Sequence, residues 1–188
     1  MRTKDENKIK SIKEAVIALC EADGFTNLTT AKVAKRAGVS PATIYLYYQD
    51  KTDLLSRLYE EVKDDLHKGL AGAIAAAGSD LEAQVRAMLR YSITQTQQYP
   101  KESHFVSALW TNQELLDDAA RAYGQTAAGP LVKLYQQIAA SPDFIDAPEV
   151  IVASFATVPQ LVLQTANDAV DDATIAQTID LVVKVLKR

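Results

Sequence analysis

Hydrophobic side chains recur along this chain at steps of three and four residues, the period of an amphipathic α-helix. The first such stripe runs through Ile9, Ile12, Val16 and Cys20. Gly24 follows this stripe, where glycine commonly ends a helix in the left-handed conformation. Alternation of apolar and polar residues, the pattern of a half-buried strand, is not convincing anywhere in the sequence. The pattern therefore predicts an all-α protein with about nine helices.

Residues 28–55 predict two short helices, a tight turn between them and the start of a longer helix. Thr29-Thr30 can cap the first short helix, and Gly38 supplies the turn because glycine tolerates a left-handed backbone. Ser40 is a good N-cap for the second helix, and Pro41 occupies its first position, where the missing N–H costs nothing. This layout is typical of a helix-turn-helix, which places its second helix in the major groove of DNA.

The rest of the chain predicts longer helices in a second domain. We expect residues 1–50 to form a helix-turn-helix domain, residues 51–69 to form a connecting helix, and residues 70–188 to form a helical domain. An Ala/Gly-rich stretch over residues 69–79 separates the two, and Gly129-Pro130 should bend or break one of the later helices. The predicted helices after the connecting one span residues 81–99, 105–110, 113–140, 148–167 and 171–188.

Charge is unevenly distributed along the chain. The net charge of −4 by itself argues against a nucleic-acid partner. Residues 1–51, however, hold nine Lys or Arg against six Asp or Glu, a net of +3, whereas residues 52–188 hold eleven against eighteen, a net of −7. A basic front on an acidic body attracts phosphate locally and keeps the remainder of the protein away from the duplex. The asymmetry therefore supports the helix-turn-helix interpretation.

Several other classes of protein are not expected. The sequence has no apolar run long enough to span a membrane and no apolar core of a signal peptide near its first residue, so we expect a cytoplasmic protein without a membrane partner. The single Cys20 excludes an internal disulfide, and His67 and His104 have no partners at metal-ligand spacing. No catalytic motif or Gly-rich phosphate loop is present, so we expect no enzyme activity, metal or cofactor.

The second short helix, residues 41–48, carries hydroxyls and tyrosines and no charged side chain. Tyr45 and Tyr47 have phenolic donors that suit phosphates and sugars beside the groove, and small or apolar neighbours suit base edges and thymine methyl groups. Core packing is the competing interpretation for these tyrosines, and we adopt it for Tyr48, four residues after Ile44. The candidate DNA-contacting residues are Thr29, Thr30, Lys32, Ser40, Ala42, Thr43, Tyr45, Leu46, Tyr47 and Lys51.

The stretch from Ile9 to Leu58 is similar to the DNA-binding domain of the TetR family of bacterial transcriptional regulators. The family pattern combines glycine-phenylalanine after the first helix, a threonine, an apolar-alanine pair, AGVS, threonine and tyrosine, an aromatic pair, and a lysine followed by leucine. The matching positions are Gly24-Phe25, Thr29-Thr30, Val33-Ala34, Ala37-Gly38-Val39-Ser40, Thr43-Ile44-Tyr45, Tyr47-Tyr48, Lys51 and Leu54-Leu55.

Two positions depart from the family pattern. Pro41-Ala42 stands where the family often has a small residue and glycine, and Tyr47 stands where histidine is common. Both departures are compatible with phosphate contacts and leave the operator sequence open. The resemblance implies DNA contacts by Thr30, Thr43, Tyr45, Tyr47 and Lys51, and it implies an all-helical effector-binding and dimerisation domain in the rest of the chain.

The segment from Val150 to Asn167 contains no charged residue, and its apolar side chains point to several sides of the predicted helix. A dimer interface on one side and a cavity on another would bury them; an uncharged polar stripe, Ser154 to Gln164, could line that cavity or form a weakly solvated face. The apolar face of the last helix suits pairing into a four-helix interface, with packing inside one chain as the alternative. The candidate interface residues are Val158, Leu161, Val162, Ile175, Ile179, Val182 and Leu186.

Aromatic and polar side chains on otherwise apolar helix faces are candidates for a small-molecule site, although each one taken singly fits the core better than a ligand contact. These candidates are Tyr91, Gln95, Phe105, Leu109, Trp110, Tyr123, Phe155 and Gln160. Because few charges lie among them, we expect a largely apolar effector. The sequence thus predicts a homodimeric repressor that an unknown small-molecule effector releases from a palindromic operator on double-stranded DNA. The alternative is a DNA-binding protein without an effector, whose C-terminal domain binds a protein partner.

Overall fold

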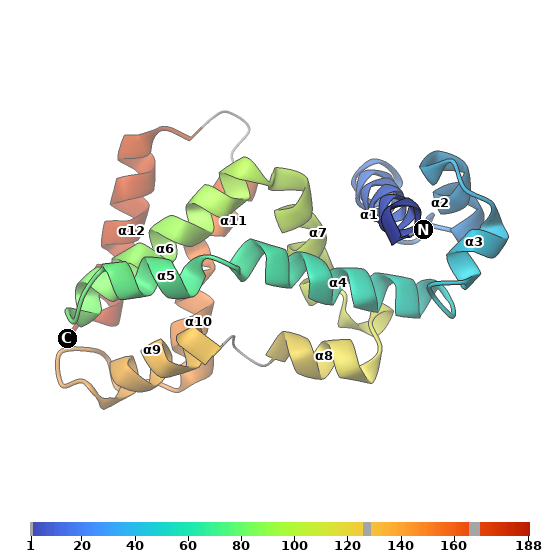
Figure 1. The fold of residues 1–188 in the computed structure, drawn as a ribbon. Coiled ribbons are helices and arrows are strands. Elements are labelled where there is room, and N and C mark those ends of the chain that lie inside the picture. Colours follow the sequence, from blue (N-terminus) through green and yellow to red (C-terminus); the bar gives the residue numbers. More distant parts are fainter. Residues whose placement is uncertain (1, 126–128, 166–169) are drawn as a thin grey trace. The chain divides into compact units, whose positions relative to one another are not determined.

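The computed structural model describes residues 2–125, 129–165 and 170–188, and within these ranges all regular secondary structure is helical (Figure 1). This confirms the all-α prediction. The helices are α1 (Arg2–Asp23), α2 (Thr30–Ala37), α3 (Pro41–Tyr45), α4 (Lys51–His67), α5 (Leu70–Ala76), α6 (Leu81–Gln98), α7 (Pro100–Thr111), a 3-10 turn η1 (Gln113–Leu115), α8 (Asp118–Gln125), α9 (Gly129–Ala140), α10 (Glu149–Ala156), α11 (Val158–Thr165) and α12 (Asp172–Leu186).

The helices fall into two compact units. The first contains α1–α4 together with α7 and α8, and the second contains α5, α6 and α9–α12. Two helices that follow residue 100 thus pack with the N-terminal helices, which no local pattern in the sequence indicates. The division into functional domains at residue 70 stays a prediction. No helix in the described ranges has the length and apolar character that crossing a lipid bilayer requires.

The core of the first unit is built from the apolar stripes that the sequence shows. Ile12 and Val16 of α1 are buried, as are Ile44 of α3 and Leu58 of α4. Each such side chain contributes about 1.5–3 kcal/mol through its removal from water. α7 completes this core, since the ring of Phe105 packs against that of Phe25 with 6.0 Å between ring centroids. The remaining fully buried side chains of this unit include Leu28, Val33, Leu54, Leu55, Tyr59, Val62 and Leu109.

The core of the second unit surrounds α6 and takes in one face of α12. α5 forms within the Ala/Gly-rich stretch and contributes Leu70 and Ile74 to this core. The inner face of α12 carries four residues that the sequence analysis assigned to a dimer interface: Ile175, Ile179, Val182 and Leu186. They are at most 4% exposed in the single chain. Their amphipathic pattern is thus explained by packing inside the chain, the alternative that the sequence left open.

The described residues form twelve α-helical segments where about nine were predicted, because two predicted helices are divided and α5 was not predicted. The helix predicted from residue 148 is broken at Thr157, between α10 and α11. Pro159 explains the break, because proline cannot donate an N–H to the carbonyl of Phe155 and its ring crowds that carbonyl. The segment predicted as one helix over 113–140 forms η1, α8 and α9, and α9 begins at Gly129, where a break was expected. The predicted end at Asn167 lies outside the described residues.

Gly124 in α8 is a position where the packing of the first unit excludes a side chain. A Cβ atom there would lie 2.7 Å from the hydroxyl of Tyr59 and 2.8 Å from a ring carbon of Trp110. Tyr59 is fully buried, so it cannot swing away. In α5, by contrast, a Cβ atom on Gly72 would meet nothing within 4 Å.

We therefore predict that Gly124→Ala lowers the free energy of unfolding by about 1 kcal/mol, because overpacking outweighs the gain in helix propensity. Gly72→Ala is the matched control and should leave the stability unchanged or raise it by up to about 1 kcal/mol. Denaturant titration followed by far-UV circular dichroism measures both. Equal stabilisation by the two substitutions would contradict the packing described around Gly124.

Candidate nucleic-acid interface

α2, the first helix of the motif, is capped by hydrogen bonds at both ends. At the start of α2, the side chain of Thr29 accepts the N–H of Lys32 at 3.2 Å. At its end, Gly38 adopts φ = 68°, a left-handed conformation that favours glycine. The N–H of Val39 donates to the carbonyl of Ala34 at 3.0 Å and so caps the last turn. The sharp turn that the sequence predicts thus forms at Gly38 and is held by backbone hydrogen bonds to α2.

α3 is shorter than the predicted helix of residues 41–48 and ends at Tyr45. Its N-cap, Ser40, accepts the N–H of Thr43 at 3.2 Å, and the Ser40 and Thr43 hydroxyl oxygens lie 2.9 Å apart. Pro41 occupies the first helical position. After α3, the N–H of Tyr47 donates to the carbonyl of Ile44 at 3.0 Å. A helix of five residues is not stable by itself, so its position depends on these caps and on its buried side.

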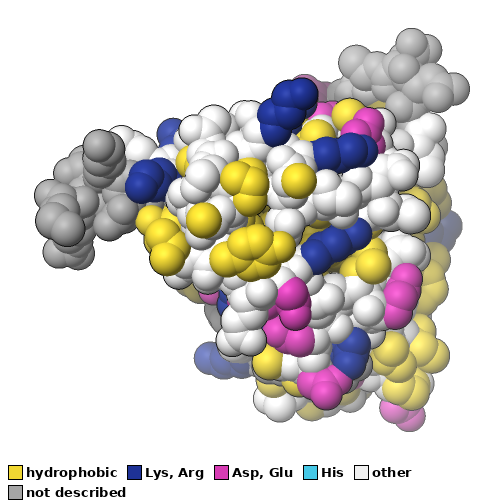
Figure 2. Space-filling model, turned by 90° about the vertical axis from the view of Figure 1, so that its right-hand side faces the viewer, with side chains coloured by type: hydrophobic (Ala, Val, Ile, Leu, Met, Phe, Trp, Pro, Cys, Tyr) yellow, Lys and Arg dark blue, Asp and Glu magenta, His cyan; other side chains and the backbone are white. Residues whose placement is uncertain are grey.

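The two sides of the α3 segment differ sharply. Ile44 and Tyr48 are buried, as their spacing predicts, and burial raises the pKa of Tyr48 to about 12 with help from Glu61 and Asp53. On the other side, Tyr45 is 57% and Leu46 78% exposed. Figure 2 views the side of the molecule that lies on the right in Figure 1, where α2 and α3 are, and shows hydrophobic side chains gathered there with Lys and Arg around them.

A hydroxyl pair links the two helices of the motif. The Thr30 Oγ1 and Tyr45 hydroxyl oxygens lie 3.1 Å apart, and either group can be the donor. Both residues are candidate phosphate contacts, so the structure brings them together. A hydroxyl can donate one hydrogen bond and accept two, so the pair can turn a donor toward an approaching anion without breaking its mutual contact.

The two candidate lysines are in different environments. Lys51 is half-buried at the start of α4, and its Nζ donates to the carbonyl of Phe25 at 2.7 Å. An ammonium has three donors, so this bond leaves others for a phosphate. Lys32 is exposed, and its Nζ lies 3.4 Å from Asp23 Oδ2. Lys51 therefore also has a structural role, since it holds the loop after α1. The sequence does not reveal this role, because its partner is a backbone carbonyl.

The turn between α3 and α4 is closed by a reciprocal pair of carboxylates. Asp50 Oδ1 accepts the N–H of Asp53 at 2.9 Å, and Asp53 Oδ2 accepts the N–H of Gln49 at 2.9 Å. The arrangement resembles a capping box, except that Asp53 reaches the N–H of Gln49, one residue before the N-cap Asp50. The spacing of the two aspartates in the sequence is the signal that points to it.

The eight candidate ligand residues divide between the two units. In the first, Phe105 and Leu109 are fully buried, Trp110 is exposed, and the Tyr123 hydroxyl donates to Asp64. In the second, the hydroxyl of Tyr91 accepts the N–H of Gly69 at 2.9 Å. The other three candidates of the second unit, all half-buried, are Gln95, Phe155 and Gln160.

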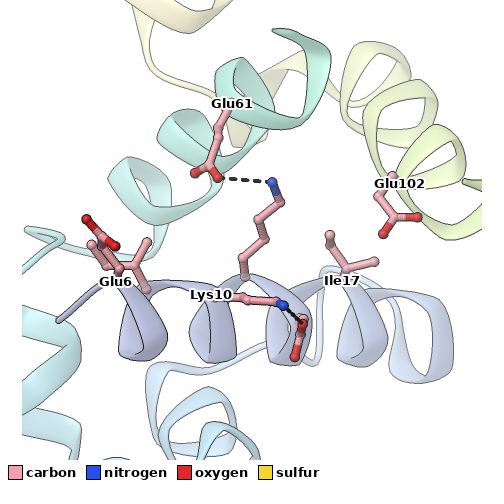
Figure 3. Close-up of a pocket in the computed structure, with 8 residues that line it drawn as sticks. Glu6, Lys10, Ile17, Glu61 and Glu102 are labelled. Atoms are coloured by element: carbon pink, nitrogen blue, oxygen red, sulfur yellow. Dashed lines mark hydrogen bonds and ion pairs between the residues drawn. The ribbon is translucent and has the colours of Figure 1, made fainter. Parts of the chain in front are cut away.

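An open groove of about 440 Å³ lies on the first unit among residues of α1, α4 and α7 (Figure 3). Figure 3 shows Glu61 reaching from α4 toward α1, where Lys13 Nζ contacts Glu61 at 3.0 Å and Asp65 at 2.7 Å. Burial lowers the pKa of Lys13, but these two carboxylates outweigh it and raise the pKa overall. The sequence analysis missed this groove, since it depends on where α7 packs. Its lining residues are Glu6, Ile9, Lys10, Lys13, Glu14, Ile17, Glu61 and Glu102.

Two further groups bear on the chemistry. Cys20 is buried, and burial raises the pKa of its thiol to about 12 against the opposing effect of Lys51. Within the described ranges, His, Cys, Asp and Glu side chains form no group of three that could hold a metal ion.

Comparison with known sequences finds a family match over the N-terminal part of the chain. Residues 12–58 match the model described as bacterial regulatory proteins, tetR family. An HTH-type transcriptional regulator of Bacillus subtilis, YxbF, is 33% identical over 70 residues, which are 37% of this chain and 18% of that protein. The Bacillus subtilis fatty acid metabolism regulator protein is 37% identical over 54 residues, 29% of this chain and 28% of that protein. The nucleoid occlusion factor SlmA of Photorhabdus laumondii is 35% identical over 65 residues, 34% and 33% of the two chains. The match to these three relatives therefore spans at most a third of their length.

Solved structures resemble the whole chain. A TetR family transcription regulator from Marinobacter aquaeolei superposes with a TM-score of 0.85 at 23% identity and covers 100% of this chain and 99% of that one. A TetR-family regulator from Haemophilus influenzae gives a TM-score of 0.76 at 17% identity, with both chains covered completely. The fatty acid degradation regulator FadR from Bacillus halodurans gives 0.70 at 18% identity and covers 94% of each chain. At these identities the likeness establishes the fold.

Proposed function

We propose that this chain, which belongs to the TetR family of bacterial transcriptional regulators, is a homodimeric repressor that a small, largely apolar effector releases from a palindromic operator. The observation that carries the DNA-binding part is the outer side of α3. It presents hydroxyl, phenol and apolar groups without a charged side chain, on a helix that caps and burial hold in place. Two such helices, one from each protomer, would enter successive major grooves about 34–36 Å apart.

The candidate contact residues on and around α3 differ in chemistry, and we assign them different parts in recognition. Tyr45, Thr30 and Lys51 carry donors that suit phosphate oxygens, which position the protein without reading sequence. Thr43 and Leu46 can reach base edges, and the 78% exposure of Leu46 gives thymine methyl groups an apolar partner.

Support for a dimer comes from the outer faces of α10–α12. Leu161 on α11 and Leu181 on α12 are each 56% exposed, and Val185 lies one turn after Leu181. Among the predicted interface residues, Leu161 is exposed, Val158 and Val162 are half-buried, and the four on α12 face the core. We therefore assign the proposed interface on α12 to the outer side of this helix, residues 174, 178, 181 and 185, in place of the predicted inner side.

Polar groups on these outer faces are satisfied within their own helices. Ser154 Oγ donates to the carbonyl of Val150 at 2.7 Å, and Thr165 Oγ1 donates to that of Leu161 at 2.8 Å. On α12, Thr178 Oγ1 donates to the carbonyl of Thr174 at 2.8 Å. Burial of a hydroxyl that already has its hydrogen bond costs little. These faces thus suit a second copy of the chain, and the protomers would pair as a four-helix interface.

The second unit is the proposed site of effector response. Tyr91, Gln95, Phe155 and Gln160 are half-buried among apolar helices, which favours an uncharged ligand. A relative named as a fatty acid metabolism regulator supports an apolar effector. Relatives named as nucleoid occlusion factors support the alternative, in which this unit binds a protein partner and no small molecule.

DNA binding is tested with a duplex that the wild-type protein selects from a random-sequence pool. Lys51→Met should weaken binding to all duplexes alike and reduce the slope of log affinity against log salt by about 1. Thr43→Ala should cost less affinity and change the preferred base at one position in each half-site. Lys133→Met removes the same charge from the exposed side of α9, outside the proposed dimer faces, and is the control. If Lys51→Met and Lys133→Met give the same salt slope, Lys51 makes no phosphate contact.

Dimerisation is tested with the double substitution Leu181→Lys/Val185→Lys. Because both side chains are exposed in the single chain, the variant should keep its helix content and sediment as a monomer with weakened DNA binding. Tyr99→Lys is the control, since it places a lysine on an exposed aromatic position of the second unit outside α10–α12. A double variant that remains fully dimeric would refute the proposed interface.

The effector is sought by a thermal-shift screen of uncharged aromatic and lipophilic compounds. A productive hit should raise the melting temperature of the protein by mass action. Bound DNA should lower the protein's affinity for the hit, and the bound hit should lower the protein's affinity for DNA by the same factor. A compound that stabilises the protein and leaves DNA affinity unchanged contradicts induction. Productive hits only among highly charged metabolites contradict the proposed site chemistry, and intact DNA binding without any hit favours the protein-partner alternative.

A further inference from the structure

Asp117, just before α8, makes two hydrogen bonds to α4 and one to the first turn of α8. Its N–H donates to Ser56 Oγ at 2.9 Å, and Ser56 is completely buried. Its Oδ1 accepts the N–H of Ala120 at 2.8 Å, and its Oδ2 accepts Arg57 Nη2 at 2.5 Å. The start of α8 therefore has a fixed place on α4, set by polar contacts.

Arg57 of α4 lies among three carboxylates. Its Nη1 contacts Glu60 Oε2 at 2.6 Å, its Nη2 contacts Asp117 Oδ2 at 2.5 Å, and its Nε lies 3.4 Å from Asp53 Oδ1. A guanidinium is a planar fork of five donors, so it can serve several oxygens at once, which a lysine ammonium does less well. Without Arg57, three negative charges would face one another.

Asp53 continues this contact to the DNA-reading segment. Its other oxygen, Oδ2, accepts the N–H of Gln49, in the turn that follows α3. The contacts thus run from Asp117 to Arg57, from Arg57 to Asp53, and from Asp53 to the backbone N–H of Gln49. All four residues belong to the first unit.

We propose that Arg57 is a positioning residue for DNA recognition. It ties the start of α8 to the turn after α3, so that a displacement of α8 alters how α3 is presented to DNA. The inference rests on the proposed DNA-binding function and adds to it the path by which α8 acts on the recognition helix.

The electrostatics of the cluster agree with a tightly held contact. Burial would raise the pKa of Asp117, but the hydrogen bonds from the Ala120 N–H and from Arg57 outweigh it, and the pKa is lowered overall. Burial likewise would lower the pKa of Arg57, and its carboxylate partners raise it instead. An isolated surface ion pair contributes little, whereas several charges that share one guanidinium act as a network.

Asp117→Asn separates positioning from simple charge effects. Asparagine remains a good N-cap for α8 but loses the charge that holds Arg57. Removal of a negative charge alone would tighten DNA binding. Positioning gives the opposite sign: we expect Asp117→Asn to weaken binding to the wild-type-selected duplex about three- to fivefold with an unchanged salt slope.

Arg57→Met should weaken DNA binding by a similar factor. The double variant should bind DNA at least as tightly as the single variant with the lower affinity, since both substitutions break the same contact between Arg57 and Asp117. The amide of Gln49 should exchange its hydrogen faster in both single variants. Arg86→Met and Asp180→Asn are the matched controls in the second unit. Arg86 is 40% exposed, against 38% for Arg57, and also joins an acid four residues earlier, Glu82, to a distant aspartate. These controls should change neither DNA affinity nor exchange at Gln49.

Thermal unfolding of each variant confirms that the first unit remains folded at the assay temperature. Asp117→Asn binding that equals or exceeds wild type overturns the proposal, and so do additive effects of the two substitutions or equal effects in the matched controls. Failure of the proposed function gives a different result, because the wild-type protein would then select no duplex from the pool.

Discussion

The interface depends on the burial of one side of a very short helix. α3 has five residues, too few to be stable alone, and neither of its caps fixes the direction in which its outer side points. Ile44 and Tyr48 supply that direction because both are buried, one in the helix and one just after it. Because these two side chains are buried, Tyr45 and Leu46 on the opposite side of the segment face outward.

α4 is the element against which the rest of the first unit is arranged. Its apolar side contributes to the core, and its polar side holds neighbours on two flanks. Glu61 receives Lys13 from α1, whereas Lys63 donates to the carbonyl of Gly124 at the end of α8 at 2.9 Å. Burial lowers the pKa of Lys63, which also lies over the rings of Tyr59 and Tyr123. α8 is thus bound to α4 at its start through Asp117 and at its end through Lys63.

Local features of the fold were predictable because each depends on a few adjacent residues. The cap at Ser40, the left-handed Gly38 and the start of α12 after Asp171 all follow from short-range chemistry. The family resemblance was readable for the same reason, since its motif is contiguous. The break at Pro159 was also present in the sequence and was overlooked.

Features that depend on distant segments were not predictable from periodicity. An apolar stripe on α12 shows that one face is covered but not whether this chain or a second copy covers it, and in the structure the chain itself does. The contact of Arg57 with Asp117 joins residues that lie 60 positions apart, and each looks like an ordinary surface charge in the sequence. The bond from Lys51 to Phe25 is hidden for a similar reason, because a backbone carbonyl leaves no mark in a sequence.

The buried thiol of Cys20 has a practical consequence. It is the chain's sole cysteine, it is 7% exposed, and its pKa is raised to about 12. A thiol reagent reacts with the thiolate and needs access to the sulfur, so in the closed molecule the reaction is blocked on both counts. The rate of labelling therefore reports how often the first unit opens. The native Cys20 can thus report the opening of the first unit by its labelling rate, without an introduced probe.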